Sequence, residues 1–482
     1  MKVSLVVLGV IFLLANFQII PPILALVIGL SVYWFTLSWT KSSRRAWWSV
    51  FFVYFGGSWG WLVNLIRGGN IDGESMFWSQ QSISTLINPP FALSLLVIFA
   101  GLYYLNKGLR TKNKKLLIIA TFLFGILVQI KVYAGILVLI GLFVAGIWRM
   151  FKRKGISLIK VFAGVSVISV LIFSPLSNDV GNSVIFKPFW FLETMMQFPD
   201  RLGWTRFGEA MVNYKLAGNW LKGIPAYFVS FAIFWFGNLG TRVFKEPLFF
   251  KHMRRIKKLS YLDVFCYSII GLGAILPIFF VQSGTAWNTI QFLYYSLMFA
   301  GILAGIAVGR FVEKSKLNTS MIYIIEVAII LLTIPTTIGT LWYHYLPSRP
   351  PARISNEELE ALEFLSKQPD GVVLTQPFSK EAAQAAVNNP PRPLYLYEST
   401  AYVSAFSGKP VFLEDEVNLE ITGYDWKNRR QKAEVFLQKP NVVFLSKNKI
   451  KYIYIVKDNH PDNVINMEKI FENDEIEIHK IY

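Results

Sequence analysis

Long apolar stretches dominate the first 345 residues of this 482-residue chain. A bilayer core requires about 20 apolar residues from each helix that crosses it. Of all residues, 54% are hydrophobic, and the mean hydropathy of +0.43 is higher than soluble domains usually reach. We therefore expect an α-helical polytopic membrane protein. Its apolar tracts lie at about 3–19, 22–37, 46–66, 91–105, 116–130, 132–148, 156–173, 223–243, 262–280, 291–309 and 319–341.

The net charge of +18 arises entirely within this apolar part. Residues 1–345 carry 31 basic and 10 acidic side chains, whereas the remainder carries 17 and 20. The positive-inside rule places the basic clusters between alternate tracts on the cytosolic side. The charge is thus predicted to orient helices, and we expect no nucleic-acid partner. The five clusters are Lys41/Arg44/Arg45, 107–115, 149–154, 242–258 and 310–316.

Placing all five clusters on one side requires an even number of crossings between them. A single helix through 116–148 would break this parity, whereas two short helices with a turn at Lys131 keep it. Lys131 would then lie in a recess below the outer surface, where a cation needs an anionic partner. Pro21–Pro22 interrupt the first apolar stretch. We interpret that stretch as two helices, which gives about 11 crossings; a signal anchor with a re-entrant piece is the alternative.

The chain after residue 345 has the composition of a soluble domain. We expect two domains, a transmembrane domain at 1–345 and a small α/β domain at 346–482, joined by the stiff linker 347–351. Ser355 and Glu358 form a capping-box pattern at the start of a helix. The run at 452–456 is β-prone, and a hairpin is predicted around 472–474. A single cysteine excludes a disulfide framework and a cysteine-based zinc site.

The predicted outer side receives the polar segments 67–90 and 175–222, among others. Asp72 and Glu74 lie in the first of these segments. A carboxylate at the membrane surface can act as a general base on an acceptor hydroxyl. The same pair can hold a divalent cation such as Mg²⁺ or Mn²⁺ beside a pyrophosphate. A solvated loop pair without chemistry is the third interpretation.

Amide, hydroxyl and aromatic side chains follow these carboxylates. Trp78, Gln80, Gln81 and Asn88 are the types that line a sugar-binding cleft, with Trp78 offering a ring face. Helix capping and anchoring at the membrane interface explain the same residues equally well.

Three cations on the predicted outer side suit a lipid-linked phosphate. Lys131 is followed by Tyr133, which we include as a contact to the carrier, and Arg201 and Arg206 lie in the second polar segment. Lysine and arginine both bind phosphate through charge-assisted hydrogen bonds. Snorkelling of Lys131 to lipid headgroups is the alternative.

The layout resembles the GT-C superfamily of polytopic membrane glycosyltransferases, most closely its uncharacterised bacterial members with a soluble C-terminal domain. Such enzymes use polyprenyl-phosphate sugars at the extracytoplasmic surface. They carry a catalytic Asp or Glu in the outer loop after their first helix, and this chain has none there. Either Asp72 or Glu74 takes that role, or the chain lacks an N-terminal portion. The resemblance rests on 77–94, 124–135, 287–295, 404–410 and 423–429.

This resemblance implies an integral membrane glycosyltransferase in the plasma membrane of a prokaryote, with its C-terminal domain extracytoplasmic. The donor would be a polyprenyl-phosphate sugar, and the acceptor a surface glycan, lipid or protein. Asp72 or Glu74 would be catalytic, and Lys131, Arg201 and Arg206 would bind the donor phosphate. A lipid or polar-solute transporter and an inactive scaffold are the competing hypotheses.

Overall fold

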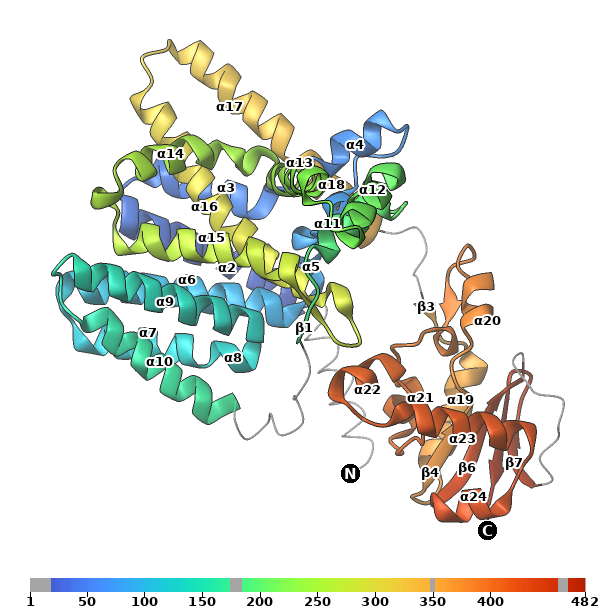
Figure 1. The fold of residues 1–482 in the computed structure, drawn as a ribbon. Helices are drawn as coiled ribbons and strands as arrows, with labels where there is room; N and C mark the ends of the chain where they lie inside the picture. The colour runs from blue at the N-terminus through green and yellow to red at the C-terminus, as the bar shows by residue number, and fades with distance from the viewer. Residues whose placement is uncertain (1–18, 174–183, 347–351, 458–466, 482) are drawn as a thin grey trace. The chain divides into compact units, whose positions relative to one another are not determined.

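The computed structural model describes residues 19–173, 184–346, 352–457 and 467–481 (Figure 1). The predicted tract at 3–19 and the linker at 347–351 lie outside these ranges, except for residue 19. The chain divides into two compact units, which consist mainly of the residues up to Leu346 and of Pro347–Tyr482. Each unit is described separately.

Unit one is helical, with one small antiparallel pairing between β1 (Val184–Phe186) and β2 (Phe280–Gln282). Its helices are α2 (Ile20–Thr40), α3 (Ser43–Phe55), α4 (Gly60–Ile66), α5 (Gln81–Ile87), α6 (Pro89–Thr111), α7 (Lys114–Gly125), α8 (Leu127–Ile130), α9 (Val132–Phe151), α10 (Ser157–Phe173), α11 (Trp190–Gln197), α12 (Thr205–Leu216), α13 (Trp220–Leu239), α14 (Glu246–Arg254), α15 (Tyr261–Phe279), α16 (Gln291–Lys314), α17 (Thr319–Thr333) and α18 (Pro335–Thr340).

Among the described residues, seven helices are long and apolar enough to cross a membrane. The pair α3 and α4, bent by 49°, makes an eighth if it is counted as one span. The sequence predicted about 11 crossings. One of the predicted tracts, 3–19, lies almost wholly outside the described residues, and α10 runs up to Phe173, the last residue before a gap in them. α7 has 12 residues. At 1.5 Å per residue, α7 extends over about 18 Å, less than the hydrocarbon thickness of about 30 Å.

The chain breaks at Lys131, as the parity of the basic clusters predicts. α8 ends at Ile130 and α9 begins at Val132, while Lys131 itself is extended, with φ −157°. Because the chain reverses there, α9 packs against both α7 and α8. α9 therefore forms an antiparallel hairpin with the segment of α7 and α8. Lys131, which is partly buried, lies at the turn of this hairpin.

The basic clusters meet at one end of unit one, which we call the basic end; the opposite end is the loop end. This convergence is the arrangement that the positive-inside rule predicts, except that Arg242 and Lys245 are buried. One ion pair and three hydrogen bonds join the helix ends there. The ion pair links Arg45 with Glu313, and the hydrogen bonds link Arg110 with the Ser38 carbonyl, Lys152 with the Lys257 carbonyl, and Tyr261 with Asn106.

α16 forms the centre of unit one and packs closely against α3. Gly301, Gly305 and Gly309 follow one another at intervals of four residues along its face. A Cβ atom added to Gly305 would lie 2.3 Å from the backbone nitrogen of Ser49 on α3. Small residues at this spacing allow helix backbones to approach closely in membranes. The Ser49 hydroxyl, which donates to the Ile302 carbonyl at 3.0 Å, strengthens the same contact.

Unit two combines a four-stranded sheet, in the order β4-β6-β8-β7, with helices. β4 and β6 run parallel, while β8 is antiparallel to both β6 and β7. A separate parallel pair joins β3 and β5. The helices and strands of unit two are β3 (Ala352–Arg353), α19 (Asn356–Lys367), β4 (Val372–Thr375), α20 (Lys380–Ala385), β5 (Arg392–Pro393), α21 (Tyr402–Ser407), α22 (Glu416–Thr422), α23 (Trp426–Gln438), α24 (Val442–Lys447), β6 (Ile450–Val456), β7 (Glu468–Glu472) and β8 (Ile476–Lys480).

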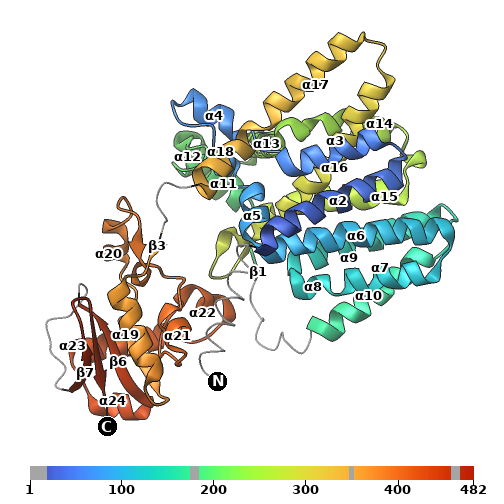
Figure 2. The same ribbon diagram turned by 180° about the vertical axis from the view of Figure 1, so that it is seen from behind.

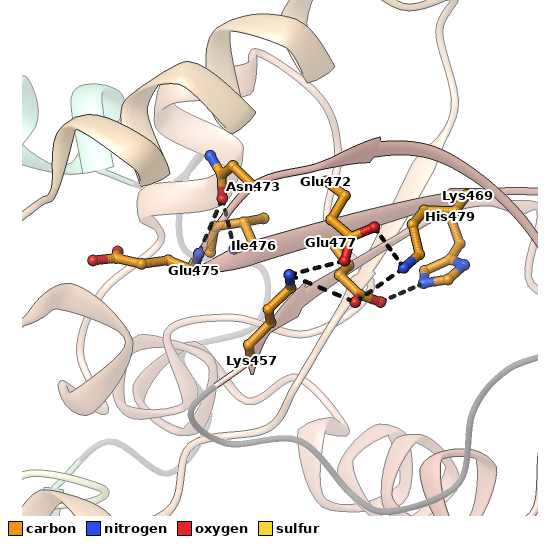
Figure 3. Close-up of polar contacts among 8 residues, drawn as sticks. All are labelled: Lys457, Lys469, Glu472, Asn473, Glu475, Ile476, Glu477 and His479. Atoms are coloured by element: carbon orange, nitrogen blue, oxygen red, sulfur yellow. Dashed lines mark hydrogen bonds and ion pairs between the residues drawn. The ribbon is translucent and has the colours of Figure 1, made fainter.

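The hairpin predicted around 472–474 joins β7 to β8 (Figure 3). The side-chain oxygen of Asn473 accepts hydrogen bonds from the backbone N–H groups of Glu475 at 3.2 Å and Ile476 at 2.8 Å. Asn commonly closes turns in this way. Lys469 bridges Glu472 and Glu477 across the two strands. The turn and the ion pairs together fix the register of the hairpin.

The close approach of α3 and α16 predicts that Gly305→Ala destabilises unit one. The added methyl group meets backbone atoms that cannot rotate away, and overpacking of this kind costs about 1–3 kcal/mol. Gly271→Ala on α15 is the matched control, because its Cβ meets nothing within 4 Å. Thermal unfolding of the detergent-solubilised protein should show a lower midpoint for Gly305→Ala alone. Equal midpoints for the two variants would contradict the packing.

Candidate active site at the loop end

α4 supports two of the sequence-predicted residues at once. The Asn64 side chain donates a hydrogen bond to the Asp72 carboxylate at 2.5 Å. Arg67, at the end of the same helix, donates to the backbone carbonyls of Arg201 and Leu202. Asp72 is only partly buried. One short helix therefore holds the loop of Asp72 and the loop of Arg201 together.

Glu74 is sequestered, unlike Asp72. Its side chain is 5% exposed, and its oxygens accept hydrogen bonds from the backbone N–H groups of Ser82 at 2.6 Å and Ile83 at 3.3 Å. These N–H groups belong to the first turn of α5, where helices leave donors unpaired. Burial raises the pKa of Glu74, and the positive charge of Arg242 opposes that rise. Glu74 thus caps a helix within the protein.

Arg242 is a central residue of this region that the sequence interpretation assigned to a cytosolic cluster. The structure corrects that assignment, because Arg242 is 1% exposed. Its guanidinium donates to the Gln81 side-chain oxygen at 2.6 Å and to the Asn238 carbonyl at 2.7 Å. Because an apolar bundle offers no water, such a cation must find its acceptors within the protein. The sequence signal was its position inside the apolar tract 223–243, one residue before the tract ends.

Arg201 lies over the ring of Trp78, with its guanidinium carbon 4.2 Å from the ring centroid. Its Nε atom is buried and has no hydrogen-bond partner among the described residues. Its only carboxylate neighbour among those residues, Asp200, lies 3.4 Å from Nη1 and is largely exposed. A buried, unpartnered guanidinium donor of this kind is suited to an anion.

Trp78, which the sequence predicts to offer a ring face to a sugar, is largely covered in the structure. The residue is 6% exposed, and its ring contacts Arg201 together with Trp190, Phe191 and Phe198. Little of the ring is left open to a sugar. Trp78 instead supports the guanidinium of Arg201 through a cation–π contact.

The amides near Trp78 differ in their availability. Gln81 is buried and engaged by Arg242 and by Met298. Asn88 caps α6 by accepting a hydrogen bond from the Phe91 N–H at 3.2 Å, which is the capping role considered above. Gln80 is partly exposed. Of the three amides, Gln80 is therefore the one placed to contact a ligand.

Lys131 and Tyr133 form a second group at the loop end. The Lys131 ammonium lies 5.7 Å from the Tyr133 ring centroid, and it makes no hydrogen bond or ion pair with described residues. Tyr133 donates to the Gln282 side chain at 2.7 Å and packs edge-on against Phe292 of α16. Tyr294, two residues further along α16, is close enough to Arg201 for the two side chains to interact electrostatically. The first turn of α16 thus lies near both groups.

The geometry gives less support to two of the earlier expectations, the phosphate-binding role of Arg206 and a metal ion at Asp72 and Glu74. Arg206 is exposed on α12 and makes no hydrogen bond or ion pair with the other candidates in the described part of the chain. No group of three or more His, Cys, Asp or Glu in the described ranges is arranged to hold a metal ion. Both Glu74 oxygens accept backbone hydrogen bonds, so a cation shared with Asp72 would have to bind beside these N–H groups.

No family model and no curated protein matches this chain. Among solved structures, the chain is similar to the Archaeoglobus fulgidus oligosaccharyltransferase in complex with zinc and sulfate, at 13% identity and a TM-score of 0.48. The same enzyme tethered to an acceptor peptide containing the NVT sequon gives 13% identity and a TM-score of 0.46. The matches cover 91% of this chain and 56% and 57% of those chains. This chain therefore spans a little over half of their length.

The two carboxylates are predicted to respond differently to truncation. Glu74→Ala leaves two α5 N–H groups without their acceptor, at a cost of about 1–3 kcal/mol for each group, and removes a negative charge that interacts with Arg242. Asp72→Ala removes one hydrogen bond at a partly exposed position, at a cost of about 1 kcal/mol. Thermal unfolding should show the larger loss for Glu74→Ala. An equal or larger loss for Asp72→Ala would contradict the capping role of Glu74.

Proposed function

We propose that this protein is an integral membrane glycosyltransferase with its active site at the loop end of unit one. It transfers a sugar from a polyprenyl-phosphate-linked donor to a surface glycan, lipid or protein on the extracytoplasmic side. The observation that carries the proposal is Arg201, whose Nε is buried and has no hydrogen-bond partner within the described part of the chain. A phosphate oxygen supplies the acceptor that this nitrogen lacks, and α4 holds the Asp72 carboxylate close to the same loop.

In this mechanism the acceptor hydroxyl attacks the anomeric carbon of the donor sugar. Asp72 takes the proton of that hydroxyl as the general base, and the bond from the anomeric carbon to the phosphate oxygen breaks. Negative charge then develops on the leaving phosphate. Arg201 stabilises this charge in surroundings that screen it less than water does. Trp78 keeps the guanidinium in position by packing against it.

Asp72 is the general base in this proposal, and Glu74 is not. A base must reach the acceptor, and the Glu74 oxygens already accept two backbone hydrogen bonds inside the protein. Asp72 is partly exposed, and its one described hydrogen bond comes from Asn64. The Asn64 amide can orient the carboxylate while leaving its second oxygen for the proton.

The proposal predicts that Asp72→Asn nearly abolishes sugar transfer without loss of folding. General-base catalysis contributes about 10²–10⁴-fold to the rate, so the residual rate should fall by that range. The assay supplies radiolabelled polyprenyl-phosphate sugar to membranes that contain the protein and follows labelled acceptor. Glu209→Gln, at an exposed acid on α12, is the control and should retain full activity. Full activity in Asp72→Asn would remove the base assignment.

Lys131 is predicted to contribute to donor binding. Removing its charge with Lys131→Ala should raise the KM for the lipid donor about tenfold to a hundredfold, since a charge-assisted hydrogen bond contributes about 1.5–3 kcal/mol. Lys187→Ala, at an exposed lysine beside β1, is the matched control. An unchanged KM in Lys131→Ala would place the donor phosphate away from this lysine.

A further inference from the structure

An apolar groove lies at the basic end of unit one, between α14, α16 and α17. It encloses about 720 Å³, and its walls include Phe244, Pro247, Phe311, Ile325, Ile329 and Leu332. α17 stands at the edge of the bundle in both views (Figures 1 and 2). The outer face of that helix exposes Ile324, Val327 and Leu331. The groove therefore lies beside a surface that is suited to contact lipid.

Three cations lie at this groove: Lys251, Arg310 and Lys314. None of them makes a hydrogen bond or ion pair with the described residues. The neighbouring carboxylates are already engaged, because Glu313 pairs with Arg45 and Glu246 pairs with Lys245 at 2.5 Å. Arg310 is partly buried, which makes an unbalanced positive charge costly. The groove thus combines an apolar interior with an unmatched positive rim.

A second cavity, of about 330 Å³, adjoins the groove and shares Leu248 and Arg310 with it. It adds Lys258 to the positive charge, whereas Arg45, which also lines it, is paired with Glu313. Its one carboxylate, Asp263, accepts hydrogen bonds from the backbone and hydroxyl of Ser260 at the start of α15. Arg310 therefore lies between an apolar space and a polar, positively charged one.

We propose that this groove binds an anionic phospholipid of the surrounding leaflet. The acyl chain occupies the apolar space between α14, α16 and α17, and the phosphate contacts Arg310 with Lys251 and Lys314. The arrangement matches the two parts of such a lipid, since hydrocarbon fills the apolar groove and the phosphate neutralises the cations at its rim. Basic pockets between membrane helices on the positively charged side are suited to lipid headgroups.

This site is separate from the proposed transfer reaction. Its residues lie where α14, α16 and α17 meet among the basic clusters, whereas Asp72, Arg201 and Lys131 lie at the loop end. A lipid bound there would hold α17, which makes few contacts with the rest of unit one, against α14 and α16. The bound lipid is thus predicted to stabilise the protein.

The test uses the full-length protein, purified in detergent and stripped of lipid. Dioleoylphosphatidylglycerol and dioleoylphosphatidylcholine are titrated separately, and binding is followed by native mass spectrometry and by the thermal midpoint. The anionic lipid should bind saturably, at least tenfold more tightly, and raise the midpoint. Lys251→Gln with Arg310→Gln should remove this preference. Lys114→Gln with Lys115→Gln, at exposed positions of the same end, should keep it.

A second pair of variants tests the apolar part separately from the charge. Ala328→Trp fills the groove while leaving its cations in place, so binding should fall at least tenfold. Val327→Trp, on the lipid-facing side of α17, should bind as the unchanged protein does.

Three outcomes would overturn the proposal. Equal binding of both lipids would mean nonspecific lipid around the helices. Full competition by soluble glycerol phosphate would show that a phosphate binds without its acyl chains. Undiminished binding in Ala328→Trp and in Lys251→Gln with Arg310→Gln, with unchanged thermal midpoints in the absence of lipid, would place the lipid elsewhere.

Discussion

The buried guanidinium of Arg242 is the constraint on which the architecture of the loop end depends. Its donors are satisfied inside the bundle by Gln81 and by the carbonyls at the end of α13. Gln81 begins α5, and Glu74 caps the first turn of the same helix. A cation that cannot reach water thereby fixes the polar loop to the apolar helices. Asp72 and Trp78 are held in place on either side of Glu74 as a consequence.

The sequence predicted those features that follow from hydrophobicity and charge alone. The convergence of the basic clusters and the helix break at Lys131 both follow from the cost of placing charge in the bilayer. The hairpin at Asn473 follows from local turn chemistry. The number of crossings was less predictable, because α7 is apolar but short, and composition does not fix where a helix ends.

Features that depend on contacts between distant residues were not predictable in the same way. Arg242 resembled the rest of a cytosolic cluster, and only the fold shows that it meets Gln81. The sequence suggested that the ring of Trp78 contacts a sugar, yet Arg201 and three aromatic rings cover it. The glycines of α16 are a pattern that sequence reasoning missed, although their spacing is visible in the chain. Their significance depends on the helix that packs against them.

The central claim is that the loop end binds the phosphate of a lipid-linked donor through Arg201. The most direct measurement is an experimental structure of the full-length protein in lipid, with a non-hydrolysable phosphonate analogue of a polyprenyl-phosphate sugar. The account predicts phosphonate density within about 3 Å of Arg201 Nε, with the sugar directed toward Asp72. Phosphonate density at the basic end, or an Arg201 side chain that remains without contact to the bound analogue, would contradict it.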